Sequence, residues 1–161
     1  MKKWMILVCG ILMLCGCGRE ETFETIADEQ VLSVMSEPKQ IFVELPEGTA
    51  APVLGGAGEQ IYLCEDYEII LETRPAGDVG GTIRSLCGYE KDALTVMETQ
   101  RQEITRYEFV WAAAGETGDR LGRAVILDDG QYHYCMSVLR DAEGVHSREV
   151  WDQVFSSVAL A

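Results

Sequence analysis

The chain has 161 residues, of which 27 are Asp or Glu and 13 are Lys or Arg, so its formal net charge is −14 at pH 7. An excess of acid argues against a nucleic-acid-binding protein, which needs basic patches to neutralise phosphates, and against lying flat on anionic lipid. Hydrophobic residues make up 47% of the chain, which excludes general disorder, and the length suits one core rather than two.

The first segment has the pattern of an export signal. Lys2 and Lys3 precede an apolar run at 4–14, and charge returns at Arg19. The run is too short to span a bilayer, which takes roughly 20 apolar residues, so cleavage is expected. An ordinary secretion signal with an incidental Cys17, and an uncleaved span, are the alternatives.

The end of this segment, Leu14-Cys15-Gly16-Cys17, resembles the lipobox of bacterial lipoproteins. The resemblance implies that residues 1–16 are a signal peptide, that signal peptidase II cleaves before Cys17, and that the Cys17 thiol carries a diacylglycerol. Loss of the two lysines would take the net charge from −14 to −16. The protein would then be anchored by lipid at the extracytoplasmic face of the cell membrane. Residues 17–37, which are acidic and lack strong periodicity, are expected to be a tether.

The remaining residues, 38–161, are expected to form a single domain that begins with strands. The apolar stretch 40–45 predicts the first strand, and 50–58 predicts a loop of small residues or a short helix. Residues 61–64 and 67–73 predict a hairpin joined by a short acidic turn.

A helix is predicted between Asp78 and Gly88. Asp78 can accept hydrogen bonds from the free amides at the helix start, and Gly88 can end the helix in a left-handed conformation. Val79, Ile83 and Leu86 would share its apolar face at spacings of four and three.

Most of the second half of the chain is predicted to form β-strands. Strands are predicted at 94–99, 106–114, 124–127 and 132–139, and Asp128-Asp129-Gly130 predicts the hairpin between the last two. Two of these strands place large side chains on one face by alternation: Tyr107, Phe109, Trp111 and Ala113 in the first, and Tyr132, Tyr134, Met136 and Val138 in the second.

A last helix is predicted from Ser147, with an apolar stripe formed by Val150, Trp151, Val154, Phe155 and Val158. Because hairpins dominate, the predicted fold class is α+β: an antiparallel sheet of about six to seven strands with helices packed against it.

Two further resemblances concern the folded part. The pattern of two helices and meandering strands, ending in 151–158, resembles the PsbP-like α/β/α sandwich found in extracytoplasmic lipoproteins. Residues 76–78, 82–83 and 122–134 are similar to stretches in small uncharacterised bacterial lipoproteins. These resemblances imply a fold and a location, and none of their motifs carries chemistry.

Three cysteines remain beyond the predicted anchor: Cys64, Cys87 and Cys135. Outside the reducing cytoplasm three thiols allow at most one bridge, and their spacing is too wide for a zinc site. A bridge between Cys64 and Cys135 and three buried free thiols are both open at this point.

Few residues of the sequence are candidates for catalysis or metal binding. His133 and Cys135 share one face of a predicted strand, so a Cys–His nucleophile pair is conceivable, although no third orienting group is evident. Glu116 with Asp119, and Asp128 with Asp129, are the densest carboxylate clusters, and turn formation is the better account of both. No cofactor and no metal is predicted.

The function expected from the sequence is therefore a non-catalytic interaction or accessory domain at the cell envelope, held by lipid on Cys17 and in contact with an envelope protein partner. A small-ligand- or substrate-binding lipoprotein is the alternative. An enzyme using the Cys135 and His133 pair, or carboxylates, is a third.

Overall fold

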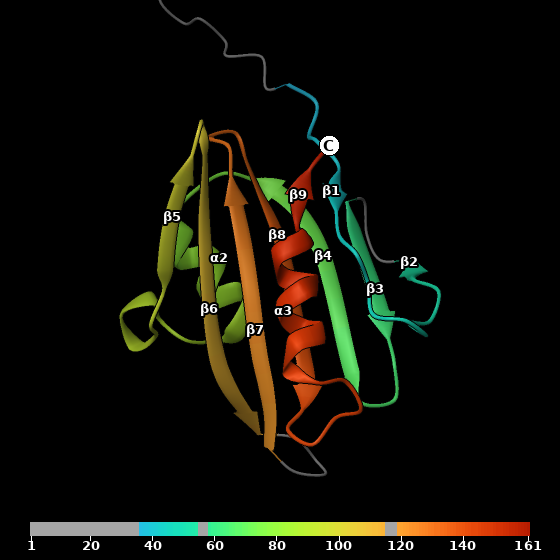
Figure 1. Ribbon diagram of the computed structural model, residues 1–161. Coiled ribbons are helices and arrows are strands. Elements are labelled where there is room, and N and C mark those ends of the chain that lie inside the picture. Colours follow the sequence, from blue (N-terminus) through green and yellow to red (C-terminus); the bar gives the residue numbers. More distant parts are fainter. Residues whose placement is uncertain (1–35, 55–57, 115–118) are drawn as a thin grey trace, which may run out of the picture. The chain divides into compact units, whose positions relative to one another are not determined.

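The protein is described from a computed structural model, which covers residues 36–54, 58–114 and 119–161 (Figure 1). The predicted signal peptide 1–16, Cys17 and nearly all of the predicted tether 17–37 lie outside the described residues, as does Glu116. What the sequence predicts for them stays a prediction.

Seven strands form one antiparallel sheet in the order β2-β3-β4-β8-β7-β6-β5. Their bounds are Val53–Leu54 for β2, Glu59–Leu63 for β3, Tyr67–Pro75 for β4, Met97–Arg101 for β5, Ile104–Ala114 for β6, Asp119–Asp128 for β7 and Tyr132–Asp141 for β8. The α+β fold class predicted from the sequence is confirmed. The finer resemblance to the PsbP-like sandwich stays a prediction.

Two predicted strands differ from the observed ones. The stretch 40–45 forms only β1, Ile41–Phe42, and pairs with β9, Ala159–Leu160, instead of joining the main sheet. The strand predicted at 94–99 begins later, at Met97, because Leu94 and Val96 first pack into the core beneath the sheet. A short 3-10 helix, η2 (Lys91–Ala93), precedes it.

The helix α2, Val79–Cys87, has the ends that the sequence predicts. The Asp78 carboxylate accepts a hydrogen bond from the Gly81 amide at 2.9 Å, and Gly88 has φ 80° and donates its amide to the Arg84 carbonyl. These contacts satisfy backbone groups that a helix end leaves unpaired.

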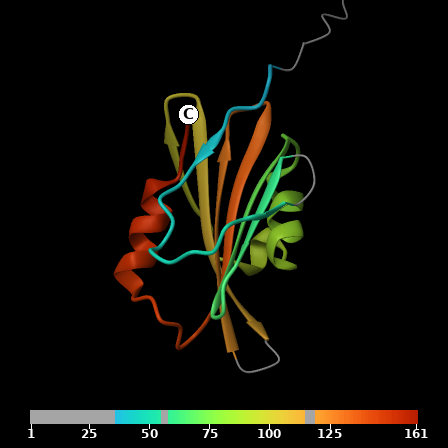
Figure 2. The same ribbon diagram turned by 90° about the vertical axis from the view of Figure 1, so that its right-hand side faces the viewer.

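Two α-helices of the described residues cover opposite faces of the sheet (Figure 2). Helix α3, Arg148–Ser157, packs on one face with the core residues Tyr67, Ile69, Leu71, Val125, Leu127, Tyr134, Met136, Val138, Trp151, Val154, Phe155 and Val158. Helix α2 packs on the other with Ile83, Phe109, Ala124, Ile126 and Cys135. The predicted aromatic faces of β6 and β8 are confirmed, and they point in opposite directions across the sheet.

The predicted hairpin at Asp128-Asp129-Gly130 is also confirmed. Gly130 has φ 85°, and the Asp129 carboxylate accepts hydrogen bonds from the amides of Gln131 and Tyr132. Burial opposes ionisation of Asp129, but these amides together with Lys39 more than offset it, so the pKa of Asp129 lies below its usual range. The acids of this turn therefore hold the hairpin together.

Candidate binding groove

A groove of about 720 Å³ lies between helix α3 and strands β5, β6 and β7. An α-helix with its side chains is about 10 Å wide, whereas neighbouring strands are about 4.8 Å apart, so one helix covers two or three strands. The α3 core packs on β4, β8 and the inner part of β7. Among the described residues, no helix covers the β6 and β5 side of the same face.

Apolar side chains at the uncovered end of this face are solvent-exposed. Val110 is 60% exposed, Met97 56% and Leu121 40%. Met97 pairs across the strands with Glu108, Val110 with Arg123, and Leu121 with Ala112. Cross-strand partners share a face, so these apolar side chains lie on the α3 side of the sheet. They border the buried side chains of α3 that line the same groove, Trp151 and Phe155.

One ion pair and the hydrogen bonds of Arg106 fasten α3 to the sheet beside the groove. The Arg123 guanidinium contacts the Asp152 carboxylate at 2.6 Å and lies 4.2 Å from the centre of the Phe155 ring. The hydrogen bond from Arg123 holds the pKa of Asp152 below its usual range. Arg106 pairs with Glu108 and donates to the Phe155 and Val158 carbonyls at the end of α3, where backbone acceptors lack helical partners.

Positive charge is in local excess in this groove. Three arginines, Arg123, Arg140 and Arg148, line it against two acids, Glu108 and Asp152, although the whole chain carries 27 acids and 13 bases. Among residues that the structure describes, the Arg140 guanidinium donates only to the Asp141 carbonyl, at 3.4 Å. Arg148 is 86% exposed and reaches only Asp152, at 3.6 Å. Arg140 therefore has no carboxylate partner among the described residues, and Arg148 shares Asp152 with Arg123, so both keep donors for an anionic group.

The predicted nucleophile pair lies elsewhere, beneath α2. His133 is fully buried, and its Nδ1 is hydrogen-bonded to the Thr82 hydroxyl at 2.8 Å. Its Nε2 lies 3.6 Å from the Asp128 carboxylate. Cys135 is also fully buried, and burial, with the nearby Glu72 charge, raises the pKa of its thiol to about 12. A nucleophilic cysteine needs a depressed pKa and access to solvent, so this geometry does not support the pair.

The suggested bridge between Cys64 and Cys135 is wrong for this structure. Both are free thiols, as is Cys87. Cys64 packs against the core on the α3 side, whereas Cys135 belongs to the core on the α2 side. The sheet separates the two sulfur atoms, so no local adjustment can join them.

The remaining candidates contribute to structure. His146 is half-buried and makes edge contacts with the rings of Tyr67 and Trp151. Asp128 and Asp129 accept turn hydrogen bonds, and Asp119 begins β7. Within the described ranges, no group of three or more His, Cys, Asp or Glu side chains is placed to hold a metal ion. None of the helices in those ranges is long and apolar enough to cross a membrane.

Cys135 is expected to react with iodoacetamide at least roughly a thousandfold more slowly in the native protein than in urea. A thiol of pKa about 12 forms far less thiolate at neutral pH than an ordinary thiol, whose pKa is about 8.5. The measurement is peptide mass spectrometry over a labelling time course, with unfolded protein as the control. Rapid native labelling of Cys135 would contradict the burial and restore the nucleophile hypothesis.

No protein-family model and no curated protein matches this chain. The groove, its charge and its exposed side chains therefore carry the functional argument.

The groove is not evident from the sequence alone. The alternation that places Tyr107, Phe109 and Trp111 in the core also places Val110 on the opposite face, which was the available signal. The missing information was how far α3 extends over that face.

Proposed function

We propose that this protein is a lipid-anchored extracytoplasmic binding protein that docks an envelope protein in the groove between α3 and strands β5 to β7. Lipid on Cys17 would hold it at the membrane, and the groove would be the docking surface. The observation that carries the proposal is the exposure of Val110, Met97 and Leu121 together on one face beside the arginines.

The composition of the groove supports a protein partner. Interface cores are enriched in aromatic residues, methionine and arginine, and exposed apolar patches on soluble domains commonly mark binding sites. Trp151, Phe155, Met97 and the arginines of the groove fit that composition. The acidic domain would be repelled by anionic lipid, which would leave this surface accessible to a neighbouring protein.

One observation favours the small-ligand alternative. A volume of about 720 Å³ falls within the range of small-molecule sites, which is about 300–1,000 Å³. In that case the purified protein would retain a small molecule detectable by native mass spectrometry, and its groove would contact no protein in cells.

Site-specific photo-crosslinking in intact cells tests the proposal. A photo-reactive residue placed at Val110 of the full-length protein is expected to give a discrete adduct with another protein, because this side chain is 60% exposed in the groove. The matched control is Val53, which is 54% exposed on β2, at the opposite edge of the sheet.

Adducts at Val110 that are absent at Val53 support docking in the groove. Equal adducts at both positions, or none at Val110, contradict it.

A further inference from the structure

The groove offers side chains to an incoming segment, but no free strand edge. The outer edge of β6 beyond Glu108 is occupied, because the Tyr89 hydroxyl donates to the Ala112 carbonyl at 3.0 Å. Residues 94–96, which lead into β5, lie along the same edge: Thr95 lines the groove, and its two apolar neighbours pack in the core on the α2 side. A segment that lies in this groove therefore gains no strand pairing and must satisfy its own backbone hydrogen bonds, as an α-helix does.

The open part of the α3 face has the width of one further helix. Figure 1 shows α3 in front of β8 and β4, with β5 and β6 to its left and no other helix of the described residues in front of them. Packed helices have axes about 8–10 Å apart, which is about the same as two strand spacings of about 4.8 Å each. A helix packed beside α3 would therefore lie over β6, two strands from β8, with Val110 beneath it.

The floor beneath such a helix is apolar. In the strand register, Met97 and Leu121 lie diagonally on either side of Val110, and all three side chains are exposed on the α3 face. Along α3 the groove extends from Arg148 to Phe155, a length of about 12 Å at about 1.5 Å per residue. Apolar side chains at positions i, i+3, i+4 and i+7 of a second helix would cover that length.

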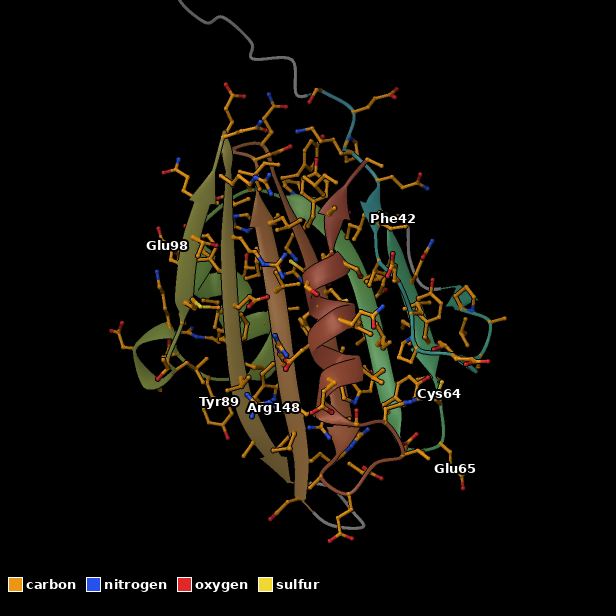
Figure 3. The ribbon with its side chains drawn as sticks, viewed as in Figure 1. Phe42, Cys64, Glu65, Tyr89, Glu98 and Arg148 are labelled. Carbon is orange, nitrogen blue, oxygen red and sulfur yellow. The ribbon has the colours of Figure 1, made fainter. Side chains whose placement is uncertain are left out.

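The charges of the groove favour a helix with acids beside its apolar stripe. Arg140 pairs across the strands with Leu121, so it lies on the same face next to the floor. Arg148 is the first residue of α3, and Figure 3 shows it between the first turn of α3 and strands β6 and β7. Both acids that line the groove already pair with arginines of the sheet. Carboxylates on the flank that faces α3 would therefore meet two cations that keep free donors.

A second copy of this chain fits the groove poorly. Its net charge of −14 would cause repulsion between the two copies. The apolar stripe of its own α3 is buried against its own sheet, so that stripe is not available to a neighbour.

We infer that the groove takes an acidic amphipathic α-helix of a partner protein, which lies over β6 beside α3. Its apolar stripe rests on Val110, Met97 and Leu121, and carboxylates on its flank reach Arg140 and Arg148. This inference rests on the proposed docking function and specifies the chemistry of the partner.

Binding of synthetic peptides to the full-length protein, held in nanodiscs of zwitterionic phospholipid, tests the inference by fluorescence anisotropy. The probe has about eighteen residues, with leucine at the helical spacing above, glutamate beside this stripe and alanine elsewhere. One control peptide has lysine in place of every glutamate. A second has the composition of the probe, but its leucines alternate with polar residues, which is a strand pattern. The probe is expected to bind at least about tenfold more tightly than either control.

A locked form of the probe separates a helical ligand from an extended one. A cross-link between positions i and i+4 on its outward face holds the peptide helical and leaves the side chains that face the groove unchanged. It is expected to bind roughly fivefold more tightly than the linear probe, because less conformational entropy is lost on binding. Weaker binding of the locked peptide would overturn a helical partner.

Arg148→Glu tests the charge of the groove. Glutamate at the start of a helix interacts favourably with the helix dipole, so the fold is expected to persist, which thermal unfolding measures. The affinity for the acidic probe is expected to fall roughly tenfold, and the lysine peptide is expected to bind more tightly than it does to the wild type. Arg101→Glu is the matched control, because it makes the same change of charge at an exposed position of β5 that does not line the groove. It is expected to leave both affinities within about twofold. The comparison of peptides on the wild type does not depend on either variant.

Equal binding of the acidic and lysine peptides, preference for the alternating peptide, or no binding of any peptide overturns the inference. So does displacement of the probe in nanodiscs of anionic phospholipid, which assigns the arginines to lipid, or its exclusion by self-association of the protein, which assigns the groove to a second copy. Protein adducts at Val110 in cells, without a preference for the acidic helical peptide, overturn this inference and leave the docking function standing. Absence of those adducts overturns both.

Discussion

Replacing Cys17 by alanine is expected to move the protein from the membrane fraction to the soluble fraction. Each buried methylene of an acyl chain contributes about 0.8 kcal/mol of membrane binding, and two or more chains hold stably where one does not. Without the thiol the diacylglycerol cannot be attached, so the protein loses its only predicted anchor. Fractionation of cells followed by immunoblotting measures the shift.

Cys15→Ala is the matched control for this experiment. It changes a cysteine two positions earlier, in a slot of the predicted lipobox that takes a small residue, and it is expected to leave the protein in the membrane fraction. Retention of the Cys17→Ala protein in the membrane would contradict the anchor. Mass spectrometry of the native N-terminus gives a second measurement, and a mature chain beginning at an unmodified residue would contradict lipidation.

Replacing Phe155 by alanine is expected to lower the free energy of unfolding by about 3–5 kcal/mol. The ring is 1% exposed in the α3 core and lies beneath the Arg123 guanidinium. Its removal takes away apolar burial, leaves a cavity in close-packed surroundings, and deprives Arg123 of a contact. Because a domain of this size is stable by roughly 5–15 kcal/mol, the loss is a large share of the total. Urea unfolding followed by tryptophan fluorescence measures it.

Phe42→Ala is the control of the same chemistry on the surface. Phe42 is 54% exposed on β1, so this variant is expected to stay within about 0.5 kcal/mol of the wild type. Similar unfolding midpoints for the Phe155 and Phe42 variants would show that α3 is not packed as described.

The local patterns of the sequence predict most elements because each depends on near neighbours. Asp78 and Gly88 end α2, and the turn at 128–130 joins β7 and β8, through contacts a few residues apart. Local patterns do not predict the length or the start of a strand when these depend on residues far away in the chain. The first strand is short because its partner is β9 at the far end of the chain, and β5 starts at Met97 because Leu94 and Val96 belong to the α2-side core.

The sequence by itself determined the α+β class, the alternating faces of β6 and β8, and the apolar stripe of α3, because periodicity reports which side of an element is buried. Only the tertiary structure decided that Cys64 and Cys135 lie in different cores, and that Val110, Leu121 and Arg148 meet at one groove. The physical reason is the sheet itself. It separates residues of opposite faces, joins strands far apart in the chain, and is wider than helix α3.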